Sequence, residues 1–118
     1  MKHPLLSQEK NPFEEALFIF NSISAEEIVM VYHGGKLSVH AEKFIQTLRK
    51  QTTLNEPVIN VLIDYTMKTN ESRLSHSLCK KTAQLLERYD IQTAEEAMHF
   101  LREYYHTYIK VAKSSLTD

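Results

Sequence analysis

Glycine, cysteine and tryptophan are almost missing from this chain of 118 residues, which has two glycines, one cysteine and no tryptophan. Phosphate-binding loops and Rossmann turns need glycine where the backbone adopts a positive φ or approaches a ligand closely, so both are disfavoured. The single cysteine, Cys79, excludes an internal disulfide framework. The composition therefore favours helices over hairpins and glycine-rich binding loops.

Long apolar runs and a large excess of one charge are missing as well. No run approaches the roughly 20 apolar residues that span a bilayer, and Met1–Lys10 lacks the apolar core of a signal peptide. A formal net charge of −1 excludes a strongly basic nucleic-acid binder of the histone type. From these absences we expect a cytoplasmic protein.

The chain is long enough for one domain with its own core. A domain of this size buries roughly two-thirds of the surface that its unfolded chain exposes, and 42% of the residues are hydrophobic. Helix starts recur as capping residues followed by apolar residues at helical spacing. Six helices are predicted, with caps at Asn11, Ser24, Ser38, Asn55, Ser75 and Thr93; the first ends near Ser22, the fourth near Met67, the fifth near Tyr89 and the sixth near Lys113.

The second predicted helix competes with a strand. The apolar run over residues 28–32 fits a buried strand equally well by periodicity alone. Ser24 and Glu27, however, form a capping box before this run, and Gly34 and Gly35 follow it as a helix stop. We therefore predict a helix here.

The fourth predicted helix is expected to be the most buried. Its apolar residues leave one polar line, Asn60, Asp64 and Lys68, spaced by four. For Asp64 we expect an ion pair with Lys68 or a bond to a neighbouring helix rather than catalysis. The sequence thus predicts an all-α fold, a compact bundle of about six helices around this one. We expect a single domain over residues 11–113, a flexible segment at 1–10 and a flexible tail at 114–118.

Part of the chain carries residue strings that are less common than a generic helix pattern. They are VINVLIDY at residues 58–65, Leu74 after a short polar loop, and IQTAEEAM at residues 91–98. Through them residues 54–98 resemble the second conserved helical domain of the DnaB/DnaD replication-initiation family of Gram-positive bacteria, whose DnaB is a helicase-loading and membrane-attachment protein. Proteins of this family are longer, so we expect a domain of a longer protein.

The resemblance implies a role in the primosome, which assembles when DNA replication starts. It implies binding to replication-initiation and helicase-loading proteins, contact with single-stranded DNA, self-association, and a location at the nucleoid, with membrane attachment for the parent protein alone. We also expect a homo-oligomer from the apolar surface of residues 12–22 and from Tyr104, Tyr105 and Tyr108, which together exceed what one six-helix core covers.

A motif of that family, a tyrosine with an isoleucine four residues on and a tryptophan four after that, falls on Leu78, Thr82 and Leu86. Bases of single strands stack on aromatic rings at about 1–3 kcal/mol per base. Because leucine replaces both rings, we expect only weak contact of this helix with DNA. The leucines can keep the structural part of the motif.

The strongest binding signal is electrostatic. Five cations lie between residues 68 and 88 against Glu71 and Glu87, whereas residues 9–31 hold five glutamates and a single lysine. The alternative explanation for the cations is an ordinary solvated helix face. The predicted nucleic-acid-binding residues are Lys68, Arg73, Lys80, Lys81 and Arg88, and among them Lys81 and Arg88 share one side of the fifth helix.

His99, Glu103 and His106 share one helix face at a spacing that can suit metal ligands. Arg102 and Lys110 flank them, which disfavours a bound cation. We therefore expect a solvated face rather than a metal site.

Catalytic chemistry has no clear carrier in this sequence. Cys79 is expected to be a buried thiol rather than a nucleophile. No pattern combines a nucleophile, a base and an oxyanion donor, so we expect no enzyme activity and no cofactor. The predicted function is a non-enzymatic replication-initiation domain that binds replication proteins, with weak single-stranded DNA contact in helicase loading. The alternative is an oligomerisation or protein-docking scaffold without nucleic-acid binding.

Overall fold

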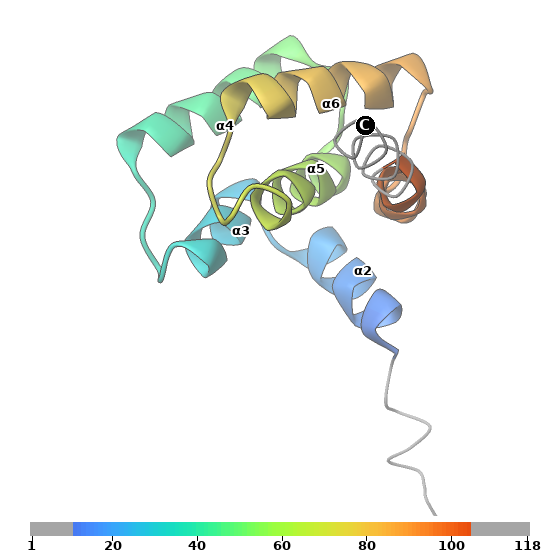
Figure 1. Cartoon of the computed structure of the whole chain (residues 1–118), viewed down its shortest axis with the longest axis horizontal. Helices are drawn as coiled ribbons and strands as arrows, with labels where there is room; N and C mark the ends of the chain where they lie inside the picture. Colours follow the sequence, from blue (N-terminus) through green and yellow to red (C-terminus); the bar gives the residue numbers. More distant parts are fainter. Residues whose placement is uncertain (1–10, 105–118) are drawn as a thin grey trace, which may run out of the picture.

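The computed structural model describes residues 11–104, which form helices joined by short connections and include no strand (Figure 1). The predicted all-α bundle of about six helices is confirmed. The predictions for segment 1–10, for the tail and for the last helix beyond Tyr104 lie outside the described residues. The helices are α2 (Pro12–Ser22), α3 (Ala25–Tyr32), α4 (Val39–Gln51), α5 (Glu56–Lys68) and α6 (His76–Arg88), followed by a C-terminal helix of which residues 94–104 are described.

Each helix begins at the capping residue that the sequence predicts. The Asn11 side chain accepts a hydrogen bond from the backbone N–H of Glu14 at 2.8 Å. The capping box of Ser24 and Glu27 is complete, with bonds of 3.2 and 2.8 Å. Residues 28–32 are therefore helical, as the capping box indicates, and not a strand. The remaining caps are Ser38, Asn55, Ser75 and Thr93.

Three helices end in turns that need a positive φ. After α3 a glycine supplies it, since Gly34 has φ 65° and the Gly35 N–H donates to the Met30 carbonyl at 2.7 Å. After α5 and α6 the sequence offers no glycine, and Glu71 (φ 54°) and Asp90 (φ 55°) take the left-handed conformation instead. The left-handed conformation is unfavourable for residues other than glycine, so the packing around Glu71 and Asp90 must offset its energetic cost.

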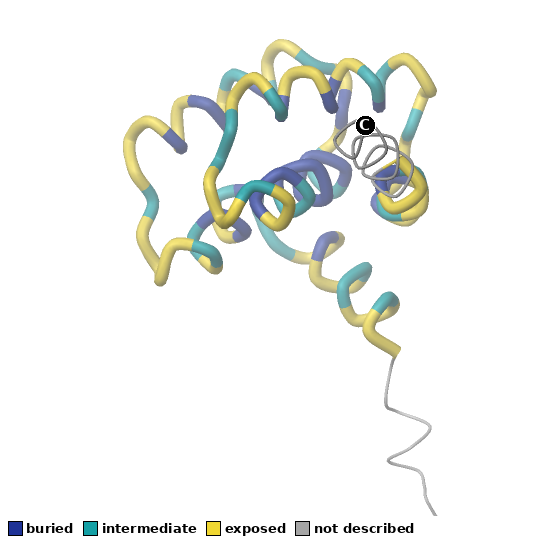
Figure 2. The backbone as a smooth tube through the Cα atoms, viewed as in Figure 1, coloured by how far each residue is buried: buried dark blue, intermediate teal, exposed yellow. Residues whose placement is uncertain are grey.

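Helix α5 runs through the middle of the bundle. In the view of Figure 1, α4 and α6 lie above α5, and α2 and α3 lie below it. The C-terminal helix, in red, lies to the right of α5. It packs against α2, α3, α4 and α6, and Figure 2 shows it buried along most of its length. The prediction that this helix is the most buried is confirmed. Its buried residues are Val58, Ile59, Asn60, Val61, Leu62, Ile63, Thr66 and Met67.

Asn60 is the buried polar residue that ties α2 to α5. Its side chain is fully buried, and its Nδ2 donates to the carbonyl oxygens of Phe20 at 2.9 Å and Ile23 at 2.7 Å. Those carbonyls belong to the end of α2, where the helix leaves its last oxygens without partners of its own. Among the described residues nothing donates to Asn60 Oδ1, so the two donated bonds carry the role of this amide.

Asp64, one turn further along α5, has two partners. It accepts a 2.6 Å hydrogen bond from the Tyr32 hydroxyl of α3, and its carboxylate lies 3.4 Å from Lys68 Nζ. Both predicted alternatives, the pair with Lys68 and a bond to a neighbouring helix, are therefore present. Burial, together with the carboxylate of Asp64, raises the pKa of Tyr32, so this hydroxyl stays protonated and keeps donating.

Arg49 joins three helices at the other end of α5. From α4, its guanidinium donates two hydrogen bonds to Glu26 of α3 (2.7 and 2.8 Å) and two to Glu56 of α5 (2.5 and 2.9 Å). Glu56 also accepts from the backbone N–H of Ala25 at 3.0 Å. The hydrogen bonds from Arg49 hold the pKa of each carboxyl below its usual range. The three residues thus stay ionised and bonded at neutral pH.

We predict that Arg49→Met lowers the free energy of unfolding by about 1–3 kcal/mol at neutral pH, because two neighbouring carboxylates lose their charge-assisted hydrogen bonds. Arg49→Lys should recover only part of this loss, since an ammonium cannot bind two carboxylates in two-pronged geometry. Urea unfolding of the three proteins measures the effect.

The stability lost in Arg49→Met should also decrease as the pH falls. Because the folded-state pKa values of Glu26 and Glu56 are lowered, their contribution is fully present above the ordinary value of 4.5 and disappears as the pH falls through the folded values. The gap between wild type and Arg49→Met should therefore close in acid. A gap that is equally large in acid would contradict an ionic origin.

Candidate functional site

The five cations that the sequence predicts as a nucleic-acid site differ in their ion pairing. Lys68, at the end of α5, pairs with Asp64, and Arg73, in the connection to α6, pairs with Glu71 at 2.9 Å. Each of these two cations is thus partly neutralised by a neighbouring carboxylate. They differ in this respect from the three cations of α6.

The outward face of α6 is where unpaired positive charge gathers. Lys80, Lys81 and Arg88 are all exposed, and within residues 11–104 no carboxylate forms an ion pair with them. The opposite side of the helix is buried through Cys79, Ala83 and other core residues. Lys81 and Arg88 share one side of the helix, and Lys80 lies nearer α4, so phosphate groups can reach these cations without competing with an ion-paired carboxylate.

The three family-motif positions lie toward the core rather than on this cationic face. Leu86 and Thr82 are buried, and Leu78 is half-buried. The Thr82 hydroxyl donates to the Leu78 carbonyl at 2.8 Å, one turn back in the same helix. Leucines at these positions fill the interior, so this side of α6 offers no surface for stacking bases.

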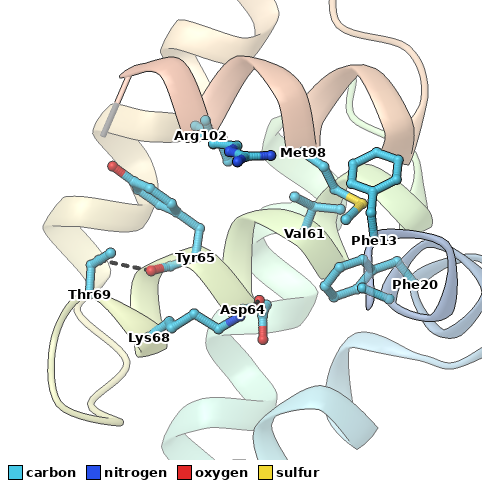
Figure 3. Close-up of a pocket in the computed structure, with 11 residues that line it drawn as sticks. Phe13, Phe20, Val61, Asp64, Tyr65, Lys68, Thr69, Met98 and Arg102 are labelled. Carbon is cyan, nitrogen blue, oxygen red and sulfur yellow. Dashed lines mark hydrogen bonds and ion pairs between the residues drawn. The ribbon is translucent and has the colours of Figure 1, made fainter. Parts of the chain in front are cut away.

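A pocket that is open to solvent lies between α2, α5 and the C-terminal helix (Figure 3). Its volume is about 370 Å³. No local pattern in the sequence predicts this pocket, because its walls come from three helices that are distant in the chain. Its lining is mainly apolar and consists of Phe13, Ala16, Phe20, Val61, Asp64, Tyr65, Lys68, Thr69, Met98, Leu101 and Arg102.

Charged groups lie on two rims of this pocket. Figure 3 shows Asp64 and Lys68 on α5, and Arg102 on the C-terminal helix at the opposite edge of the pocket. Asp64 is already engaged by Tyr32 and Lys68. In the described part of the chain no carboxylate pairs with Arg102. The pocket therefore combines an apolar floor with a surplus of positive charge at its edge.

The remaining reactive side chains have structural roles. Cys79 is fully buried and its thiol donates to Thr66 Oγ1 at 3.3 Å. Burial raises the pKa of this thiol to about 11, so it is not a nucleophile at neutral pH. The His76 ring stacks on Phe44 of α4 at 3.9 Å, and burial, helped by His40 and Lys80, holds its pKa below its ordinary value.

Of the three residues with metal-ligand spacing on the last helix, the structure describes His99 and Glu103. His99 and Glu103 are both exposed, as the predicted solvated face requires, and the His99 ring lies 4.8 Å from the ring of Phe13 of α2. His106, Lys110, Tyr105 and Tyr108 lie outside the described residues. Over residues 11–104 there is no group of three or more His, Cys, Asp or Glu side chains that could hold a metal ion.

Comparisons with known proteins leave the family prediction as it stands. A scan against family models, a search of curated proteins and a search of solved structures found no match to this chain. None of the helices in the described range combines the length and the apolar character that crossing a bilayer requires. The resemblance of residues 54–98 therefore stays a prediction.

We predict that restoring the family's rings does not create a DNA-binding surface. In Leu78→Tyr with Leu86→Trp, the tryptophan must enter a fully buried position, which costs about 1–3 kcal/mol through overpacking. Leu78→Tyr alone, at a half-buried position, should cost less. Thermal melts and oligonucleotide titrations measure both quantities, and a stable double variant with tighter DNA binding would contradict the assignment of Leu86 to the core.

Proposed function

We propose that this chain is a non-enzymatic adaptor domain of replication initiation that binds other replication proteins and contacts single-stranded DNA weakly. The observation that carries the proposal is the exposed side of α6, on which Lys81 and Arg88 lie together, with Lys80 exposed nearer α4, and none of the three has an ion pair within residues 11–104. The resemblance of residues 54–98 supplies the replication context. Initiation and helicase-loading proteins are the partners that this context favours.

Weak and sequence-independent binding follows from the chemistry of this face. Lysine and arginine side chains contact phosphates, which position a strand but carry no sequence information. With both motif rings replaced by buried or half-buried leucines, base stacking adds nothing on this helix. Affinity then depends on counterion release alone and falls as salt is added.

A second candidate function is a protein-docking scaffold without nucleic-acid binding. The apolar pocket between α2, α5 and the C-terminal helix favours it, because such a surface accepts side chains of a protein rather than phosphates. The two functions differ in one measurable quantity. Only the first requires a salt-dependent affinity for oligonucleotides.

We predict that fluorescence anisotropy with a labelled single-stranded oligonucleotide gives a slope of log K against log salt of about −2, for three phosphate contacts. Lys81→Gln with Arg88→Gln should reduce the magnitude of this slope by about 1.4, because two contacts are removed. The effect should be the same for oligonucleotides of different sequence.

The matched control carries the same loss of charge elsewhere. Lys68→Gln with Arg73→Gln removes two cations that Asp64 and Glu71 already pair with, so the slope should change little. Equal effects of the two double variants would show a response to net charge rather than a site on α6. Absence of any binding at low salt would favour the docking scaffold.

A further inference from the structure

Two histidine rings lie next to each other where α4 meets α6. The ring centroids of His40 on α4 and His76 on α6 are 6.4 Å apart, and both residues are exposed. The His76 ring also stacks on the Phe44 ring of α4, with centroids 3.9 Å apart and 3° between the ring planes. This stack holds the His76 ring against α4. Two imidazoles from different helices are therefore close together and open to solvent.

Lys80 adds a positive charge beside this pair. It lies one turn after His76 on α6, hence on the same side of the helix. It also lines a pocket of about 310 Å³ with Thr47 and Gln51 of α4, so it lies on the side of α6 that faces α4. Burial, and then the charges of His40 and Lys80, lower the pKa of His76. We call His40, His76 and Lys80 the histidine–lysine cluster.

The histidine–lysine cluster has no carboxylate partner within residues 11–104. On α4, Glu42 lies two residues after His40 and so faces another side of the helix, whereas Lys43, three residues after it, lies on the same side. In the connection before α6, Glu71 pairs with Arg73. The protein thus supplies no negative charge that favours protonated rings here, and an external anion can supply it.

We propose that His40, His76 and Lys80 form an anion site across α4 and α6 that binds a phosphate group when both rings are protonated. A protonated imidazole N–H reaches an anionic oxygen at about 2.7–2.9 Å, so rings with centroids 6.4 Å apart have room for one phosphate group between them. The anion offsets the repulsion among three cations, so binding and protonation favour each other. The site therefore fills as the pH falls through the range in which histidine titrates.

The phosphate group can come from a nucleic-acid strand or from a free anion. In the first case the inference rests on the proposed function, because the cluster extends the exposed cations of α6 onto α4. In the second case it does not need DNA. The two sources require separate measurements.

Oligonucleotide titrations at about pH 5.5 and about pH 8 test the strand as the source. Phosphodiesters stay ionised at both values, so a pH effect reports on the protein. Two added contacts should increase the magnitude of the slope of log K against log salt by about 1.4 at the lower pH. His40→Gln with His76→Gln should remove this increase and leave the slope at the higher pH unchanged, which also shows that the variant is folded. His33→Gln with His99→Gln, two exposed histidines outside the cluster, is the matched control and should keep the increase.

Sulfate, a dianion at both pH values, tests the site without DNA. At constant ionic strength it should raise the pKa values of the His40 and His76 rings, followed by their NMR signals. Lys80→Gln should reduce this rise, whereas Lys81→Gln, the neighbouring lysine of α6, should not.

The two measurements separate the anion site from the proposed function. Raised ring pKa values without oligonucleotide binding would support the site with a free anion as its ligand, and would contradict the proposed contact with DNA. Ring pKa values that ignore sulfate, together with a slope that is the same at both pH values, would overturn the anion site. Oligonucleotide binding in that case would leave the proposed function intact.

Discussion

The rest of the structure depends on the burial of a helix that is not entirely apolar. α5 packs against four neighbours, yet it carries a polar line at every fourth position. Burying a polar group without a hydrogen bond costs several kcal/mol in the worst case, so each member of the line needs a partner on a neighbouring element or at the surface. Asn60 holds the end of α2, and Asp64 holds Tyr32 of α3. The hydrogen bonds that satisfy the polar groups of α5 thus also set the positions of α2 and α3.

Arg49 completes this arrangement from the α4 side. Its two carboxylate partners come from α3 and α5, so a single guanidinium holds three helices at one point. Planar two-pronged geometry makes the contact directional as well as attractive. With α2 held by Asn60 and α4 held by Arg49, α5 keeps separate faces for its neighbours. One face meets α6 through Thr66, and another forms the floor of the pocket.

That separation shapes what the domain can bind. The cationic side chains of α6 and the pocket lie on elements that meet different faces of α5, so phosphates and protein side chains need not compete. The surfaces also differ in how they gain affinity. Phosphate contacts weaken with salt through counterion release, whereas an apolar pocket keeps most of its affinity because it removes nonpolar surface from water. The proposed weak DNA contact on α6 and a protein contact at the pocket can therefore operate in the same molecule.

Local chemistry let the sequence alone determine the helices of this protein: the caps at Asn11, Ser24, Ser38, Asn55, Ser75 and Thr93, the helical nature of residues 28–32, and the central place of the fourth helix. These features depend on residues within four positions of each other, which a linear pattern contains. Only the tertiary structure decided that Arg49 bridges Glu26 and Glu56, and that α2, α5 and the C-terminal helix line a pocket. Such features arise between residues far apart in the chain, whose approach is set by packing around α5 and leaves no local signal in the sequence.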